Sequence, residues 1–248
     1  MRRSLLPAVL SLSLLLSAVA TTYAASYTFT TIAVPGATLL TEAFGINTAG
    51  QIVGRWLDDM GGGGFLKDGA TFTFIDDPSA LYTEAHGINA AGQIVGWFQN
   101  DLTGHFHGFL KDGATYTTVD FPDALSTFAN GINAAGQIVG RFDDATPSVH
   151  AVVTDGVTFT TIDVPGASET VAFGINAAGQ IVGWFFDGTR GYGFLKDGAT
   201  FTTIAVPGAT YGGTEAFGIN AAGQIVGVFG DATGNYGFLA TPARRPQK

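Results

Sequence analysis

Three glutamates recur at one position of a repeated sequence and are the carboxylates best placed for acid–base chemistry. Glu42, Glu84 and Glu215 occupy the same place, whereas two further copies have Phe128 and Val171 there. Glycoside hydrolysis needs two carboxyl groups, one as acid and one as nucleophile or base. An acid and a base need different environments, and copies of one repeat position have similar ones. A structural role or cation binding is therefore favoured over catalysis by this set.

Aromatic and arginine side chains lie at or beside the variable segments of the repeat and are candidates for ligand binding. A sugar ring stacks on flat apolar faces, and several weak sites on one rigid scaffold bind a polymeric glycan by avidity. Packing between neighbouring repeats is the alternative role, and it is the commoner one for large aromatic side chains. The candidate set is Trp56, Trp97, Phe106, Trp184, Arg190, Tyr192 and Tyr236.

Metal and cofactor chemistry has little support in the sequence. His105 and His107 would place two imidazoles on one side of a strand, but no carboxylate or thiol at a fixed spacing accompanies them. The aspartates that begin the variable loops lack the spaced oxygen ligands of a calcium loop. No nucleophile elbow, phosphate loop or dinucleotide fingerprint occurs. The sequence therefore predicts no metal site, no cofactor and no catalytic residue.

The first 25 residues read as a secretory signal peptide. Arg2 and Arg3 precede an apolar run from Leu5 to Leu16, and small residues follow it. The run is too short for a membrane span, so we expect export to the periplasm or the medium, without membrane insertion. Without the two arginines the formal net charge of −9 becomes more negative, which disfavours nucleic acid as a partner. The chain has no cysteine, so packing and hydrogen bonds must stabilise the exported protein.

The elements that position the candidate residues come from a repeat of about 43 residues. Its strongest word, Gly-Ile-Asn-x-Ala-Gly-Gln-Ile-Val-Gly, begins at Gly45, Gly87, Gly131, Gly174 and Gly218. A second word, Gly-Phe-Leu-Lys-Asp-Gly, and a third, Phe-Thr-Thr-Ile, recur with the same period, some copies being degraded. Asn-x-Ala-Gly and Lys-Asp-Gly each interrupt the apolar alternation with turn residues, so two hairpins and four antiparallel strands are expected per repeat.

Four strands in about 43 residues match one blade of a β-propeller. The fold predicted is therefore all-β, a five-bladed β-propeller over residues 26–240, with a disordered polar tail over 241–248. The chain begins with a fourth-strand word, Tyr27 to Ile32, and ends with a third-strand word, Gly237 to Leu239. We expect the N-terminal strand to complete the last blade and close the ring. Glu42, Glu84 and Glu215 then lie near the mouth of the central channel.

The repeats resemble the HAF repeats of predicted bacterial extracellular proteins, which are named for a His-Ala-Phe-like triplet followed by a short hairpin and a Gly-Ile-Asn segment. The triplet corresponds to His107-Gly108-Phe109 and His150-Ala151-Val152, while the other copies have Gly63, Tyr192 or Tyr236 in place of the histidine. The resemblance covers residues 26–240. It implies an extracellular repeat protein and brings no catalytic residue with it.

Two ends of the blades differ in sequence. One end carries the near-identical turns, whereas the other carries connections that vary from copy to copy, where binding residues are more often found. These connections are 57–63, 99–106, 143–149, 186–192 and 230–236. We therefore expect a non-catalytic binding or scaffold protein that recognises carbohydrate, or another cell-envelope component, through these loops. The alternatives are a polysaccharide-active enzyme, a glycosidase or a lyase, and a purely structural assembly protein.

Overall fold

The computed structural model describes residues 31–100, 102, 104–146, 148–210 and 213–242, and within these ranges the regular structure is β-strand. The compact unit that they form begins at Ile32. The expected signal peptide, residues 1–25, and positions 243–248 of the expected tail lie outside the described residues. The described part of the chain has no helix with the length and apolar character needed to cross a membrane.

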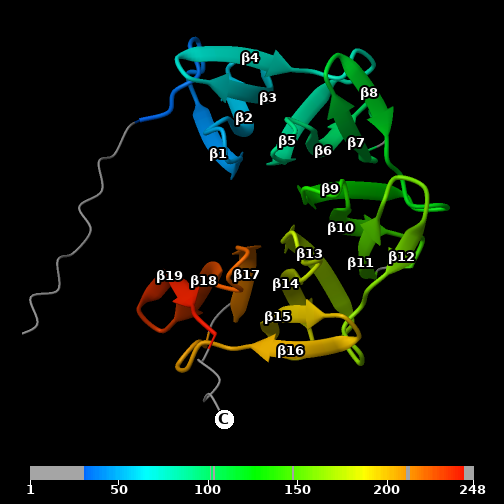
Figure 1. Ribbon diagram of the computed structural model, residues 1–248, viewed down its shortest axis with the longest axis vertical. Helices are drawn as coiled ribbons and strands as arrows, with labels where there is room; N and C mark the ends of the chain where they lie inside the picture. The colour runs from blue at the N-terminus through cyan, green and yellow to red at the C-terminus, as the bar shows by residue number, and fades with distance from the viewer. Residues whose placement is uncertain (1–30, 101, 103, 147, 211–212, 243–248) are drawn as a thin grey trace, which may run out of the picture. The chain divides into compact units, whose positions relative to one another are not determined.

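Each of the first four repeats forms four antiparallel strands, and the described part of the fifth forms three (Figure 1). Repeat 1 contains β1 (Leu40–Ile46), β2 (Ile52–Asp58), β3 (Gly61–Asp68) and β4 (Thr71–Ile75). Repeat 2 contains β5 (Tyr82–Ile88), β6 (Ile94–Gln99), β7 (His107–Asp112) and β8 (Thr115–Thr118). Repeat 3 contains β9 (Ser126–Ile132), β10 (Ile138–Asp143), β11 (Val149–Thr154) and β12 (Phe159–Thr161). Repeat 4 contains β13 (Glu169–Ile175), β14 (Ile181–Phe186), β15 (Gly191–Asp197) and β16 (Thr200–Ile204), and repeat 5 contains β17 (Thr214–Ile219), β18 (Ile225–Asp231) and β19 (Gly234–Ala240).

The two predicted turns explain where these strands end. In repeat 2, the Asn89 side-chain oxygen accepts hydrogen bonds from the main-chain N–H groups of Ala91 and Gln93, both at 3.0 Å. Gly92 follows with a φ of 82°, a conformation that only glycine adopts at little cost. The Gln93 amide then donates to Asp112 of the Lys-Asp-Gly turn over 3.0 Å. The two repeated words are therefore joined by a direct hydrogen bond.

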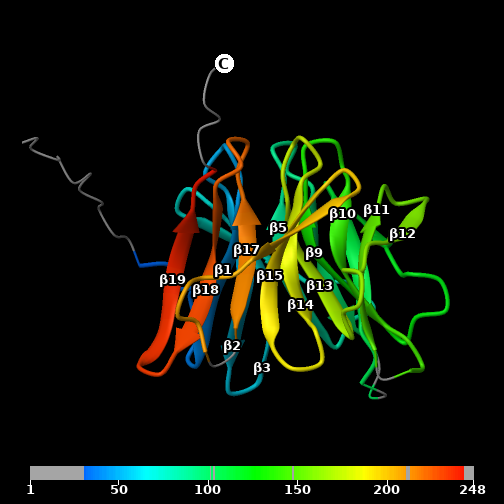
Figure 2. The ribbon, with the colours of Figure 1, turned by 90° about the horizontal axis from the view of Figure 1, so that it is seen from below.

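The repeats pack on one another in chain order, with β1, β5, β9, β13 and β17 innermost (Figure 1). In each interface a valine of one repeat shares an apolar cluster with an isoleucine of the next, as Val53 does with Ile88. The glycine that opens the main word lies against the next repeat: a Cβ on Gly45 would sit 2.8 Å from the His86 carbonyl oxygen. A larger residue would separate the innermost strands, so glycine is required there. Seen from the side in Figure 2, the strands run between two ends formed by the connections.

The prediction of a closed five-bladed β-propeller is wrong. The strands form four hydrogen-bonded sheets of four, four, eight and three strands, and none of them closes into a barrel or propeller. The eight-stranded sheet joins repeats 3 and 4 through one parallel pair, Val149 with Glu169. β19 pairs with β18 alone among the described residues, and Ile32, the end of the expected closing strand, lies in no strand. The phase of the repeat predicts which strands exist, whereas pairing between the two chain ends has no local turn to encode it.

Candidate ligand-binding cavity

The innermost strand of every repeat carries a β-bulge at the same position. The ladder between the first and second strands skips one residue each time, and that residue has no cross-strand partner. It directly precedes the glycine of the Gly-Ile-Asn segment. A bulge re-aims the side chain of the extra residue and is common beside functional sites. The five bulge residues are Phe44, His86, Asn130, Phe173 and Phe217.

All five bulge residues line one cavity, together with Ala43. The cavity has a volume of about 410 Å³, which lies in the range that holds small ligands. Phe44 and Phe217 are each 42 % exposed, so substantial aromatic surface is accessible. The apolar alternation of the sequence does not reveal these residues, because a bulge interrupts the two-residue period on which strand assignment depends. An alignment of the five repeats could have revealed the bulge residues, because an aromatic or polar residue precedes the glycine of each Gly-Ile-Asn segment.

The cavity wall is ordered by contacts between successive repeats. The rings of Phe44 and His86 stack with centroids 4.5 Å apart and an interplanar angle of 9°. Phe173 meets Phe217 edge to face at 5.2 Å. Asn130 donates from its side-chain NH2 group to the Ala172 carbonyl over 2.9 Å. Its amide oxygen is an acceptor that has no partner among the described residues. The wall thus combines flat apolar faces with two polar groups.

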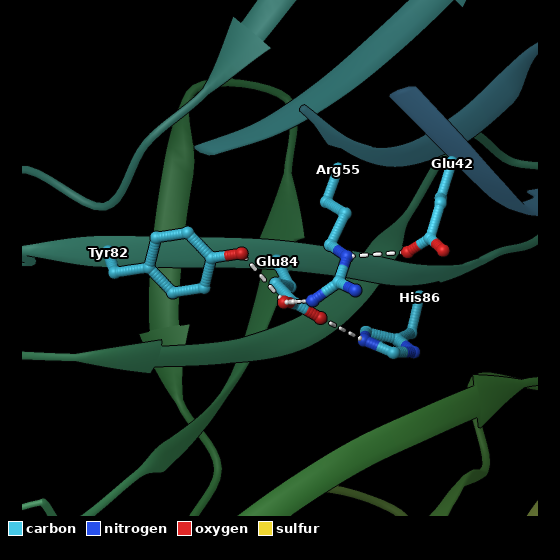
Figure 3. A network of polar contacts seen from close by, with 5 residues as sticks. All are labelled: Glu42, Arg55, Tyr82, Glu84 and His86. Atoms are coloured by element: carbon cyan, nitrogen blue, oxygen red, sulfur yellow. Dashed lines mark hydrogen bonds and ion pairs between the residues drawn. The ribbon is translucent and has the colours of Figure 1, made fainter. Parts of the chain in front are cut away.

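A charged network holds His86 at this wall (Figure 3). Arg55 donates from Nε to Glu42 and from Nη1 to Glu84, both at 2.6 Å. Tyr82 donates to Glu84 at 2.7 Å, and the imidazole Nε2 of His86 lies 2.9 Å from the second Glu84 oxygen. Glu84 is only 2 % exposed, so these partners replace its hydration.

The electrostatics of the network fix its protonation. Burial alone would raise the pKa of Glu84, but the hydrogen bonds from His86, Tyr82 and Arg55 outweigh it and lower that pKa. Burial and the neighbouring Glu84 charge raise the pKa of Tyr82 to about 12. Glu84 is therefore an anion and Tyr82 a neutral donor at neutral pH. Because an ionised carboxylate only accepts, His86 donates to Glu84 from Nε2.

The three glutamates predicted at the channel mouth do not form one set. Glu42 and Glu84 lie together across Arg55, whereas Glu215 on β17 has Val228 as its cross-strand partner in place of an arginine. Burial raises the pKa of Glu215. Sequence reasoning found the shared repeat position but not the arginine that distinguishes the first two copies from the last.

The tryptophans predicted to bind ligand lie in two different environments. Trp97 contacts Tyr82 and His86 in its own repeat and reaches Phe106 at 5.0 Å and Phe128 of the next repeat at 5.6 Å. Its ring therefore fills the interface between repeats 2 and 3. Trp184 occupies the same repeat position as Trp97 and stacks with Phe186, with centroids 6.3 Å apart.

Trp56 is one residue further along its repeat, so it occupies the opposite face of the strand. It lies 5.2 Å from Phe74.

The remaining predicted residues lie within single repeats. Tyr192 stacks on Phe185 at 5.5 Å and lies under Arg190, whose guanidinium also donates to the Ala209 carbonyl. Tyr236 lies 5.6 Å from Phe229 and hydrogen-bonds to Thr233 at 2.8 Å. These positions do not converge on a shared pocket in the described structure. Their role in ligand binding stays a prediction.

His107, one of the two histidines considered for metal binding, pairs with an aspartate. His107 Nδ1 lies 2.7 Å from Asp120, and the equivalent His150 lies 2.6 Å from Asp163. Within the described ranges, no group of three or more histidine, aspartate or glutamate side chains has the arrangement of a metal site. The two His–Asp pairs instead join the third strand of each repeat to the segment that follows the fourth strand.

No protein-family model matches the chain, and no curated protein matches it significantly. The assignment to the HAF repeats therefore stays a prediction. Among solved structures, the Aleuria aurantia lectin N224Q mutant in complex with Fucα1-6GlcNAc is 14 % identical over 83 % of this chain and 79 % of the lectin, with a TM-score of 0.48. The same mutant with α-methyl-L-fucoside gives 14 % identity, coverage of 83 % and 78 %, and a TM-score of 0.47. An acylaminoacyl peptidase from Pyrococcus horikoshii is 14 % identical over 72 % of this chain and 30 % of the peptidase, with a TM-score of 0.45. Similarity at this level transfers no ligand or activity to this chain.

Proposed function

We propose that this chain is a non-catalytic binding protein that holds a sugar unit of a glycan in the central cavity. The observation that carries the proposal is the convergence of five bulged side chains, one from each repeat, on a single cavity of about 410 Å³. A bulge costs ladder hydrogen bonds, and five at one position are consistent with selection for the side chains that they aim.

The chemistry of the wall suits a saccharide. Phe44, Phe173 and Phe217 offer apolar ring faces, on which the C–H face of a pyranose can stack. The second ring nitrogen of His86 and the Asn130 amide oxygen offer hydrogen-bonding groups to the hydroxyls at the edge of such a ring. The chain carries a formal net charge of −9, which favours a neutral or amino sugar over an acidic one. Most small-molecule sites combine an apolar lining with a few fixed polar groups in the same way.

The Glu42 and Glu84 carboxylates fit a binding role better than catalysis. A glycosidase needs a carboxyl group that is protonated at working pH. Glu84 has the opposite property, since three hydrogen bonds lower its pKa, and Glu42 shares the same guanidinium. We assign the Arg55–Glu84 network the task of positioning His86.

The proposal places the ligand in the cavity and not on the variable loops. The aromatic side chains beside those loops are engaged by other side chains, as Trp97 is by Phe106 and Phe128. The five bulge residues also differ from one another, with three phenylalanines, one histidine and one asparagine. Such a site binds one sugar unit in one orientation, in contrast to five equal pockets.

A glycan array with the purified chain, followed by calorimetric titration of any hit, tests the proposal. We expect Phe217→Ala and His86→Ala each to weaken binding at least tenfold, about 1.4 kcal/mol. Phe74→Ala is the matched control, because Phe74 is a partly exposed phenylalanine on the outermost strand β4. Failure to bind any glycan, or equal binding by all four proteins, would refute the proposal.

We also infer that the chain is exported, which would bring the cavity into contact with envelope or extracellular polysaccharide. The support is the sequence of residues 1–25, with its basic start, apolar run and small residues. Expression with its own leader in a bacterial host should release a protein whose N-terminus lies between residues 21 and 26. Retention in the cytoplasm with an intact N-terminus would refute export without affecting the binding proposal.

A further inference from the structure

The two terminal repeats each expose one half of an interface that the inner repeats bury. Val226 in repeat 5 is 50 % exposed, whereas the valines at its position in the other repeats, Val53, Val95, Val139 and Val182, are all fully buried. In repeat 1, Ile46 is 67 % exposed, whereas Ile88 and Ile132 at the same position are 8 % and 9 % exposed. The buried valines and isoleucines meet each other between repeats. Val226 and Ile46 therefore occupy the valine and isoleucine positions of this interface, and neither is buried against a partner of the other type.

In the described part of the chain, the polar contacts of the interface are also missing at repeat 5. Side-chain amides of Asn47, Asn89, Asn133 and Asn176 each donate to the main-chain carbonyl of the asparagine in the next repeat, at 3.0–3.2 Å. The Asn220 amide has only Gln224 as a partner among the described residues. A Cβ on Gly218 would meet only Val226 of its own repeat, whereas Gly174 lies against the backbone of the following repeat.

We name these surfaces the trailing face, formed by Gly218, Val226 and Leu239, and the leading face, formed by Ala43, Ile46 and Ile52. Leu239 is exposed, whereas the equivalent Leu195 packs into the cluster that joins repeats 4 and 5. Ala43 is exposed, whereas the equivalent Ala85 is fully buried. The leading face also has a hollow of about 220 Å³ beside Ile46 and Ile52.

We propose that the trailing face of one copy of this chain docks on the leading face of a second copy. Each face continues an interface that the chain already forms four times with the same residue types. The trailing face presents the valine, glycine and leucine that each of the first four repeats has at the same positions, except for Val153 in place of the leucine in repeat 3. The leading face presents the isoleucine and alanine that receive them.

The charge pattern is compatible with this contact. The six residues of the two faces carry no charge, although the whole chain has a formal net charge of −9. Two copies can therefore approach through these faces without opposing carboxylates. Because the faces differ, the contact is head to tail, and each added copy leaves one face of each kind open.

Analytical ultracentrifugation of the purified chain over a wide concentration range tests the proposal. We expect the average mass to rise with concentration, and Val226→Asp or Ile46→Asp to weaken self-association about 100-fold by burying an unpaired charge. Val157→Asp and Leu81→Asp are matched controls, since both residues are exposed and lie outside the two faces. Circular dichroism and thermal unfolding establish that each variant is folded.

Mixing the two interface variants gives the sharpest result. The Val226→Asp chain keeps its leading face and the Ile46→Asp chain keeps its trailing face, so an equimolar mixture should form 1:1 dimers that grow no further. A wild-type chain that stays monomeric at all concentrations would overturn the proposal. So would continued self-association of Ile46→Asp alone, which would indicate contact between like faces, or dissociation caused by the control substitutions.

Discussion

The side-chain amide of Asn89 donates a hydrogen bond to the main-chain carbonyl of Asn133, 44 positions later in the chain, over 3.2 Å. The same asparagine closes its own turn by accepting from Ala91 and Gln93. One side chain thus ends a strand and ties its repeat to the next. This double role explains why the Gly-Ile-Asn word recurs without change in all five copies.

Replacement of the Gly-Ile-Asn asparagine in a repeat that has neighbours on both sides should lower the free energy of unfolding. Asn133 is buried and makes the turn contacts as well as a bond to Asn176, so Asn133→Ala leaves several buried polar groups without partners. We expect the free energy of unfolding to fall by about 2 kcal/mol. Urea unfolding followed by tryptophan fluorescence measures the change.

The terminal copy supplies the control for this substitution. Asn220 makes the same turn contacts but is exposed, and among the described residues its side-chain amide has no partner in another repeat. Asn220→Ala should therefore cost about 1 kcal/mol or less. Equal costs at the two positions would show that the contact between repeats contributes nothing.

Any side chain at the last glycine of the Gly-Ile-Asn-x-Ala-Gly-Gln-Ile-Val-Gly segment should destabilise the fold. A Cβ on Gly140 would lie 1.9 Å from the Phe128 carbonyl oxygen, a backbone atom that cannot move without breaking the β9–β10 ladder. We expect Gly140→Ala to lower the free energy of unfolding by more than about 3 kcal/mol. At Gly237 the nearest atom would be 3.7 Å away, so Gly237→Ala should be nearly neutral. Thermal unfolding of both variants compares them, and a stable Gly140→Ala protein would contradict the packing described.

Acid should weaken the fold through Glu84. Hydrogen bonds lower the pKa of Glu84 in the folded state, so its contribution to stability is complete above its ordinary value of 4.5 and is lost as the pH falls through the lower folded value. Glu84→Gln should therefore cost about 3 kcal/mol at pH 7, and the cost should shrink in acid.

Glu215 should behave in the opposite way. Burial raises its folded pKa, so its ionised form opposes folding at neutral pH and this penalty disappears as the pH falls through the raised value. Glu215→Gln should increase stability at pH 7 and have little effect in acid. Urea unfolding of both variants at a series of pH values, with wild type beside them, gives the two slopes. Parallel pH profiles for the two variants would contradict the assignment.

The strands and turns were predictable because their signals are local. Asn-x-Ala-Gly and Lys-Asp-Gly contain the glycines that the turns need, and Gly92 and Gly113 indeed have positive φ values. The predicted hairpins around them are present in β5 to β8. The expectation that the ring closes was wrong, because pairing between the two chain ends has no local turn signal to support it.

The candidate site was predicted only in part. The sequence shows that Glu42, Glu84 and Glu215 share one repeat position, but not that Arg55 joins the first two of them. Trp56 was grouped with Trp97 by residue type, although the two lie at different repeat positions and on different strand faces. The bulge residues were not predicted as site residues. A bulge shifts the alternation of side chains by one position, and only the pairing register of the strands reveals that shift.

Fluorescence of Trp97 tests most directly whether a glycan binds in the cavity lined by the bulge residues. Its ring lies 5.9 Å from that of His86, so a ligand in the cavity changes its surroundings, and a chain with Trp56→Phe and Trp184→Phe reports from Trp97 alone. Titration with a glycan identified on the array should give a saturable change that His86→Ala abolishes and Phe74→Ala preserves. A saturable change that persists unaltered in the His86→Ala chain would contradict binding in the cavity.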